Sequence, residues 1–144
     1  MFELTLIKEL TGTSWSLQTY QSQDVNGEVF YPLGEDAEGI ISITDKAWFV
    51  VEIMANDKYH ELTQEMLDKY NTAIEREMAE HGFHAYSGPI EIDEEESILT
   101  THVKFSLIRD YIGTSQRRKL KLEGDKLHLY NVAHPERRLV WKRL

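Results

Sequence analysis

Three strands are predicted in the stretch Leu99–Leu129, LTTHVKFSLIRDYIGTSQRRKLKLEGDKLHL. Its clearest turn is Glu123-Gly124-Asp125-Lys126, because a Gly-Asp pair between two alternating runs is typical of a two-residue hairpin. Pairing Glu123 with Lys126 fixes the register, since residues two apart in a strand share a face. The opposed pairs on the inner face are then Leu122 with Leu127, Leu120 with Leu129, and Arg118 with Asn131. Arg118 carries the one charge among these inner-face residues, so one charged side chain is expected inside the sheet.

The strand before this hairpin is expected to turn at Asp110-Tyr111-Ile112-Gly113. The same register then places Phe105 beside Arg118, Val103 beside Leu120, and Thr101 beside Leu122. His102 and Lys104 are expected to point outward, as are Arg117 and Lys119. The stretch therefore predicts a sheet whose outer face is basic and solvent-exposed.

Composition limits the possible partners of the chain. Its 144 residues fit a single domain, residues 1–144, that can bury a core without cross-links. Sixteen basic against twenty-five acidic residues give a net charge of −9, which disfavours nucleic acid and anionic membranes as partners. The chain has no cysteine, no long apolar run and no signal-like start, so a cytoplasmic protein is expected.

The remaining strands follow from alternation of apolar and polar residues. They are expected at Thr13–Ser22, with Trp15, Leu17 and Thr19 on one face, and after Asn26-Gly27, Gly39–Thr44, Trp48–Met54, Phe83–Asp93 and Arg137–Lys142. Ile90 is expected opposite Thr101, Tyr86 opposite Phe105, Leu139 opposite Leu129 and Trp141 opposite Leu127. About eight antiparallel strands close most simply as an up-and-down barrel, so the predicted class is all-β.

One helix interrupts the strands between Thr63 and His81. A helical stripe of apolar residues predicts it, and Thr63 and Gly82 suit its two ends. The stripe consists of Met66, Tyr70, Ala73, Ile74 and Met78, whereas Glu75, Glu77 and Glu80 lie off it. The helix is expected to cover the open end of the barrel, either as a lid or as fixed core.

Six short motifs together resemble the small bacterial lipocalin-like domain family. They are Leu10–Leu17 (LTGTSWSL), Tyr31–Asp36 (YPLGED), Tyr86–Gly88 (YSG), Thr101–Val103 (THV), Gly113–Gln116 (GTSQ) followed by Arg118, and Leu139–Trp141 (LVW). The resemblance implies an eight-stranded barrel closed at one end by the first-strand tryptophan, which a basic residue of the last strand often covers. Arg143 is the candidate for that cover. The chain departs from the family's usual Gly-Thr-Trp by the additional Ser14, which a bulge in the first strand would accommodate.

The registers predict a ligand cavity at the helix end of the barrel. Tyr86, Phe105, Arg118 and Asn131 place polar tips on an apolar wall there, and Arg118 with Tyr86 would hold an anionic head group. The full candidate set is Phe49, Val51, Tyr70, Tyr86, Val103, Phe105, Leu120, Arg118 and Asn131. The alternative is a structural ion pair between Arg118 and Glu52, if Trp48, Val50 and Glu52 face inward in place of the more apolar Phe49, Val51 and Ile53.

Two classes of function fit this cavity. A carrier or sensor would bury a small apolar or amphipathic acid. A cofactor-independent isomerase or cyclase would use Tyr86 as an acid and Arg118 to stabilise negative charge, and it would need a second titratable group beside Tyr86. A third possibility is an interaction module that uses the outer sheet, and a homodimer is left open. His81-x-x-His84 does not predict a metal site, because Gly82 separates the two histidines and no third ligand has a known spacing. No cofactor motif is present.

Overall fold

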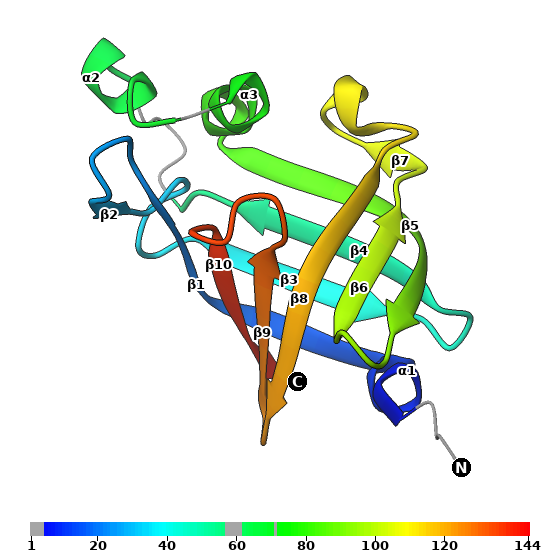
Figure 1. The fold of residues 1–144 in the computed structure, drawn as a ribbon. Helices are drawn as coiled ribbons and strands as arrows, with labels where there is room; N and C mark the ends of the chain where they lie inside the picture. Colours follow the sequence, from blue (N-terminus) through cyan, green and yellow to red (C-terminus); the bar gives the residue numbers. More distant parts are fainter. Residues whose placement is uncertain (1–4, 57–61, 71) are drawn as a thin grey trace.

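The structure is a computed structural model that describes residues 5–56, 62–70 and 72–144. Eight strands form a closed antiparallel barrel (Figure 1), which confirms the predicted class. They are β1 (Thr13–Gln23), β3 (Glu38–Ile43), β4 (Trp48–Met54), β5 (Phe83–Asp93), β6 (Ile98–His102), β8 (Ser115–Glu123), β9 (Lys126–Asn131) and β10 (Arg138–Arg143). The first and last of these strands, β1 and β10, pair with each other and close the cylinder.

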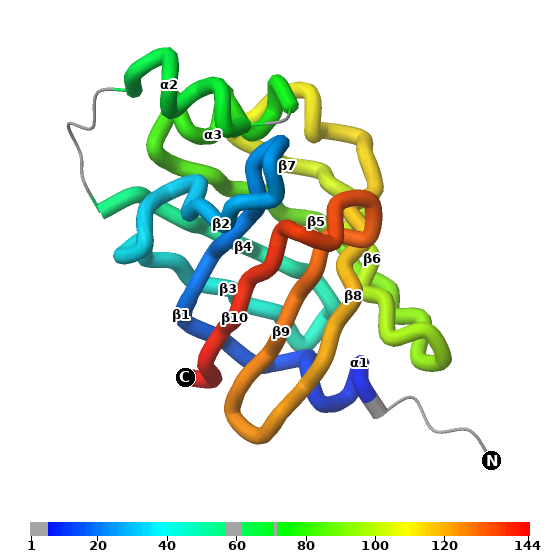
Figure 2. The backbone as a smooth tube through the Cα atoms, turned by 60° about the vertical axis from the view of Figure 1, so that its left-hand side comes forward, coloured from blue at the N-terminus to red at the C-terminus, as the bar shows by residue number. Residues whose placement is uncertain are grey.

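Short elements lie at the two ends of the barrel. α1 (Thr5–Leu10) lies at one end, and α2 (Gln64–Leu67) and α3 (Ala73–His81) lie at the other, as the two views in Figures 1 and 2 show. Strand β2 (Val29–Phe30) pairs with the end of β1, β7 (Phe105–Ser106) pairs with β5, and a 3-10 turn, η1, covers Arg109–Tyr111. The barrel thus has a helix end, formed by α2 and α3, and a base, formed by α1.

Several predicted registers are confirmed. Arg118 lies opposite Asn131 in the β8–β9 hairpin, as the Gly124 turn required. Leu129 lies opposite Leu139, and Ile90 opposite Thr101. In β4, Phe49, Val51 and Ile53 are buried, which confirms the more apolar of the two possible inner sets.

The predicted register between β6 and β8 is wrong. Arg118 pairs with Leu99, which lies six residues earlier in the chain than the expected Phe105. The reason is that residues 103–114 do not form a tight turn but leave the ladder through β7 and η1. Two backbone hydrogen bonds close this excursion, from Val103 N to Thr114 O at 2.9 Å and from Gly113 N to Val103 O at 2.9 Å.

Phe105 does not face the interior, contrary to the prediction. Ile90 pairs with Thr101, but Tyr86 pairs with Ser106. The segment from Thr101 to Ser106 is therefore one residue longer than the part of β5 that it faces. Such a bulge reverses the side-chain alternation beyond it, and Phe105 is 67% exposed. Gly88 permits this geometry, because a Cβ atom there would lie 1.9 Å from the carbonyl oxygen of His102.

The first strand also contains a bulge, although not at Ser14. Pairing is regular from Thr13 to Ser16, and the register shifts between Leu17 and Thr19. Thr19 is consequently exposed and Tyr20 is buried, the reverse of the predicted alternation. The shift brings a phenol into the barrel near its helix end.

The predicted helix is two helices. Thr63 and Thr72 each cap one by accepting a hydrogen bond from a backbone N–H group, and Gly82 ends the second with φ +64°. The break changes the rotational phase of the second helix. Glu75, expected to face solvent, is 4% exposed, and Ala73, expected on the apolar stripe, is exposed.

The base of the barrel is tightly closed. Trp15 is 1% exposed, and its indole Nε1 donates to Thr13 Oγ1 at 2.8 Å. The guanidinium of Arg143 lies 5.7 Å from the centre of the Trp15 ring, as the predicted cover requires. The carboxylate of Glu94 accepts hydrogen bonds from the backbone N–H groups of Leu6 and Ile7 in the first turn of α1, at 2.7 and 3.1 Å.

Candidate functional site

A cavity of about 70 Å³ lies inside the barrel beneath α3. Aliphatic side chains of β3, β4 and β9 form part of its wall, and Ile74 and Met78 of α3 form its cover. Its remaining wall is aromatic and charged. The aromatic and charged residues that line it are Tyr20, Phe49, Glu75, His84, Tyr86, Tyr111, Arg118, Arg137 and Trp141.

Five of the nine predicted site residues line this cavity: Phe49, Val51, Tyr86, Arg118 and Asn131. Val103 and Leu120 are buried in the core, but they do not line it. Phe105 lies on the outer surface, 6.3 Å from the ring centre of Trp48. The structure therefore brings only part of the predicted set together at the cavity.

Tyr70 lies outside the barrel cavity, contrary to the prediction. Its hydroxyl donates to the carbonyl of Pro32 at 2.5 Å, and its ring contacts Phe30 edge-on at 5.4 Å. It borders a second hollow, of about 370 Å³, between the segment after β2 and the two helices. Burial raises the pKa of Tyr70 to about 12, so this phenol is a structural donor.

Arg118 enters the cavity from β8, between the outward-facing Arg117 and Lys119. Its guanidinium donates to the carbonyl of Arg117 at 3.0 Å and to Oε1 of Gln116 at 3.3 Å. Burial acts to lower its pKa, but Tyr86 and Tyr111 raise it more, and the pKa of Arg118 is raised overall. The group therefore stays charged inside the cavity.

No carboxylate of the described residues forms an ion pair with Arg118. Glu52, the partner considered from the sequence, is exposed on the opposite face of β4. The structural ion pair is thus not formed. Arg118 is therefore a cation at a largely apolar cavity, and no carboxylate in residues 5–56, 62–70 and 72–144 neutralises it.

Three aromatic rings contact one another beside Arg118. The ring centres of His84 and Tyr86 are 5.3 Å apart, those of His84 and Tyr111 are 5.3 Å apart, and those of Tyr86 and Tyr111 are 5.4 Å apart. Burial, aided by the positive charge of Arg118, lowers the pKa of His84 to about 4, and burial raises the pKa of Tyr86 to about 12. At neutral pH both side chains are uncharged.

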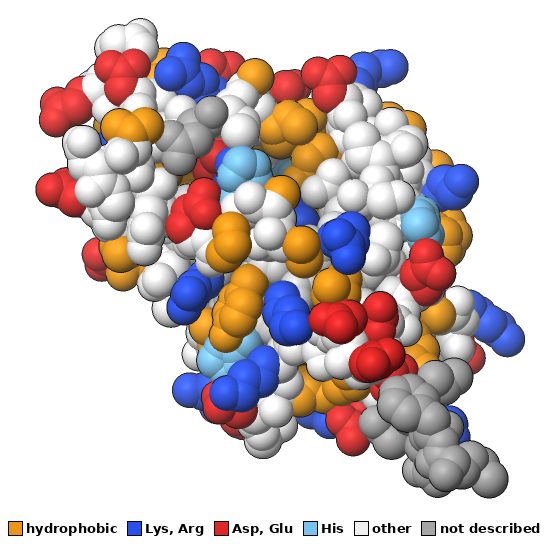
Figure 3. All heavy atoms as spheres, viewed as in Figure 1, with side chains coloured by type: hydrophobic (Ala, Val, Ile, Leu, Met, Phe, Trp, Pro, Cys, Tyr) orange, Lys and Arg blue, Asp and Glu red, His pale blue; other side chains and the backbone are white. Residues whose placement is uncertain are grey.

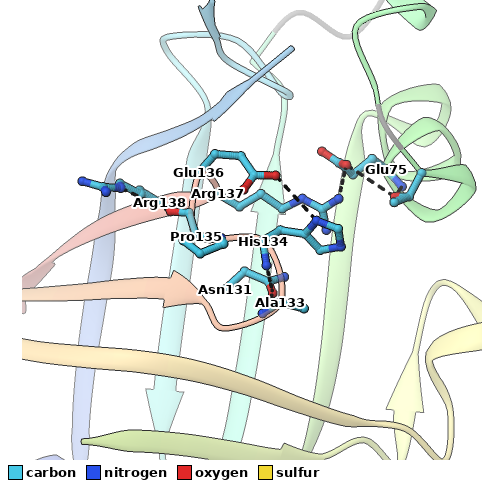
Figure 4. A network of polar contacts seen from close by, with 9 residues as sticks. Glu75, Asn131, Ala133, His134, Pro135, Glu136, Arg137 and Arg138 are labelled. Atoms are coloured by element: carbon cyan, nitrogen blue, oxygen red, sulfur yellow. Dashed lines mark hydrogen bonds and ion pairs between the residues drawn. The ribbon is translucent and has the colours of Figure 1, made fainter. Parts of the chain in front are cut away.

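The charged residues at the helix end form a clasp between α3 and the β9–β10 loop. Glu75 and Arg137 form a buried ion pair (Figure 4). The hydroxyl of Thr72 donates to Oε1 of Glu75 at 3.4 Å. Burial raises the pKa of Glu75, whereas Arg137 acts to lower it. Oδ1 of Asn131 shapes the loop by accepting from the backbone of Ala133 and His134 at 2.9 and 3.0 Å.

The cavity and the closure by Trp15 and Arg143 indicate the family to which the chain is related, and a comparison with family models tests this relationship. A model of the lipocalin-like domain matches residues 12–143, which is nearly the whole chain. The chain belongs to the lipocalin-like domain family. No curated protein sequence matches it. A lipocalin-like barrel is consistent with small-ligand binding in general.

Within this lipocalin-like barrel, sequence reasoning missed Tyr20, Glu75, His84 and Tyr111, which all line the cavity. The predicted registers do admit Arg137 to the polar level of Tyr86, Arg118 and Asn131, and Arg137 lines the cavity as well. The predicted alternation, with Trp15, Leu17 and Thr19 on the inner face, implies that Tyr20 faces outward, because the bulge in β1 leaves no mark on the apolar pattern. A continuous helix places Glu75 on the solvent side, although Thr72 is a residue type that can start a second helix. Tyr111 was placed in a tight turn.

The histidine pair His81 and His84 does not form a site in the described structure. His81 is exposed beside Glu77 at 3.7 Å, while His84 points into the barrel, so the two do not converge. Among residues 5–56, 62–70 and 72–144, no three His, Asp or Glu residues are placed to hold a metal ion. No helix in the same ranges is long and apolar enough to cross a bilayer. Basic, acidic and hydrophobic side chains are interspersed on the face that carries β8, β9 and β10 (Figure 3).

Proposed function

We propose that the barrel binds a small, mostly apolar molecule with one acidic group, such as a carboxylate, and that Arg118 is the counter-ion. The observation that carries this proposal is that the guanidinium of Arg118 lines an apolar cavity without a carboxylate partner among the described residues. Arg118 is partly buried, and a charge withdrawn from water is costly unless it is paired. A ligand carboxylate would supply the missing pair, because guanidinium presents two parallel donors to it.

The charge of the lining supports a single acidic group. The ionised residues around the cavity are Arg118, Arg137 and Glu75, which leave a formal charge of +1 when His84 is neutral. One carboxylate neutralises this charge. The surrounding protein carries a net charge of −9 and would repel the same ligand elsewhere.

The size of the cavity implies that α3 moves when a ligand binds. Its volume of about 70 Å³ lies below the roughly 300–1,000 Å³ of typical small-molecule sites. A ligand of more than a few atoms therefore requires α3 to shift outward from the barrel end. The Glu75–Arg137 ion pair joins α3 to the β9–β10 loop, so it would have to yield or follow this movement.

Native mass spectrometry of the purified protein tests the proposal. We expect small acids to be released from the wild-type protein and from Arg117→Leu, which removes a neighbouring outward-facing arginine. Arg118→Leu should lose them, because an apolar side chain cannot neutralise a carboxylate. Equal retention by Arg118→Leu and Arg117→Leu would contradict the assigned counter-ion.

A cofactor-independent isomerase or cyclase is the second candidate. The observation in its favour is that His84 lies beside Tyr86, with 5.3 Å between their ring centres, and thus supplies a second titratable group. Its lowered pKa of about 4 makes His84 a weak base at neutral pH, and Glu52 points away. Binding without reaction is therefore preferred. Chromatography of the recovered ligand distinguishes the two, because only an enzyme would return an isomer of the added acid.

A further inference from the structure

Unpaired polar atoms gather around the barrel cavity. Six buried side-chain polar atoms lack a hydrogen-bond partner in the described part of the chain, and four of them belong to residues that line this cavity. These four are Oε2 of Glu75, Nδ1 of His84, Nε of Arg137 and Nε1 of Trp141. Since roughly 90% or more of buried polar groups in proteins are paired, their concentration at one place indicates an occupant that makes hydrogen bonds.

His84 is the most informative of these residues. It is 8% exposed, it lies on β5 at the helix end, and its ring contacts the rings of Tyr86 and Tyr111. Burial keeps its imidazole neutral, with a lowered pKa of about 4. A neutral imidazole has one donor and one acceptor nitrogen. The neutral imidazole of His84 is therefore suited to hydrogen-bond an uncharged oxygen, whereas the charged guanidinium of Arg118 is suited to an anionic group.

We infer that the ligand carries, besides its acidic group, at least one hydroxyl or carbonyl oxygen that hydrogen-bonds to His84. The inference rests on the proposed function, because Arg118 is taken to hold the acidic group of the same molecule. It narrows the ligand class from simple hydrocarbon acids to oxygenated acids. A pure hydrocarbon chain would leave Nδ1 of His84 unpaired, which costs binding free energy.

The aromatic lining indicates which probes to use. Phe49, Tyr86, Tyr111 and Trp141 present ring surfaces to the cavity, and aromatic rings pack well on other rings. Phenylacetate, mandelate and para-hydroxyphenylacetate share one ring and one carboxylate. Mandelate adds a hydroxyl next to the carboxylate, and para-hydroxyphenylacetate adds one at the far end, so the set also reports where the second oxygen binds.

Titration calorimetry of the whole protein with these three acids tests the inference. At least one hydroxylated acid should bind about tenfold or more tightly than phenylacetate, because a site built for a hydroxyl discriminates against ligands that lack it. His84→Phe keeps an aromatic ring and removes both nitrogens, so the ratio should fall to near one. His81→Phe, on the exposed end of α3, should leave the ratio unchanged.

The possible outcomes separate this inference from the proposed function. Equal affinity of wild-type protein for all three acids would overturn the inference and mean that water satisfies His84, while the role of Arg118 would stand. An unchanged hydroxyl preference in folded His84→Phe would overturn it as well. Absence of binding by all three acids would count against both proposals. The wild-type ratio needs no variant, so misfolding of His84→Phe, detected by circular dichroism, does not remove the test.

Discussion

The two ends of the barrel use the same kinds of side chain for opposite purposes. At the base, Trp15 is buried with its indole N–H bonded to Thr13, whose own hydroxyl donates to the carbonyl of Leu10 at 2.5 Å. At the helix end, Nδ1 of His84 has no partner in the described chain and Arg118 has no carboxylate. The base is optimised for stability. The helix end retains unsatisfied groups, as expected where a protein reserves interactions for a ligand.

Removal of Trp15 should give the largest change in stability. Trp15→Ala leaves a cavity in the fully buried base, and we expect the free energy of unfolding to fall by about 4 kcal/mol. Urea denaturation followed by far-ultraviolet circular dichroism measures it. Arg143→Ala removes only the exposed cover of the same ring and should cost less than about 1 kcal/mol. Similar losses for the two variants would contradict the assignment of the base as a packed plug.

The neutral His84 predicts that acid weakens the helix end. Its pKa is lowered to about 4 in the folded protein, against an ordinary value of about 6.5. The unfolded chain therefore binds more protons between these values, and the stabilisation is full above pH 6.5 and is lost as pH falls through 4. We expect His84 to contribute a loss of about 3 kcal/mol over this range.

Denaturation curves at several pH values measure this contribution. In His84→Phe the decline between pH 6.5 and 4 should be shallower than in the wild-type protein, because no proton is gained on unfolding at this position. His81→Phe, which changes an exposed histidine, should retain the wild-type slope. Parallel slopes in all three proteins would show that His84 is not buried as a neutral group.

The clasp between α3 and the β9–β10 loop should have an intermediate effect. Glu75→Gln leaves the buried guanidinium of Arg137 without its counter-charge, and we expect a loss of about 2 kcal/mol in the free energy of unfolding. Combining it with Arg137→Met should recover most of that loss, since neither charge then remains buried. A double variant that is less stable than Glu75→Gln would mean that Arg137 stabilises the fold independently of Glu75.

Arg118→Leu should have the smallest effect on stability and the opposite sign. Because Arg118 has no ion-pair partner in the described chain, replacing it by an apolar residue should leave the free energy of unfolding unchanged or raise it by about 1 kcal/mol. The measurement is thermal unfolding without added ligand. A loss of more than about 2 kcal/mol would instead identify Arg118 as a structural residue.

The sequence predicted well wherever a tight turn defined the pairing. Gly124-Asp125 determined the β8–β9 register, and with it the inward direction of Arg118, because a two-residue turn permits only one pairing. The lipocalin-like motifs led to the correct closure by Trp15 and Arg143. These features depend on local rules that one strand pair or one motif can express.

Prediction failed where an extra residue or a break changed the phase of a pattern. One inserted residue turned Phe105 outward, another turned Tyr20 inward, and the interrupted helix buried Glu75. The pattern of apolar and polar residues does not reveal such a shift, because the residues before the shift and the residues after it each keep a regular pattern. Two of these shifts bring Tyr20 and Glu75 into the cavity lining, so the general location of the cavity was predictable but these two lining residues were not.

The seam between β1 and β10 governs how the molecule can be assembled. Trp15 pairs with Arg143, and the backbone N–H of Leu144 donates to the carbonyl of Ser14 at 2.9 Å. The contacts that close the barrel therefore join the first strand of the sequence to the last one. Contacts of such long range slow folding. Until β10 has been synthesised and docked, β1 and β9 both present free edges, and a nascent or truncated chain is therefore exposed to pairing with other chains at those edges.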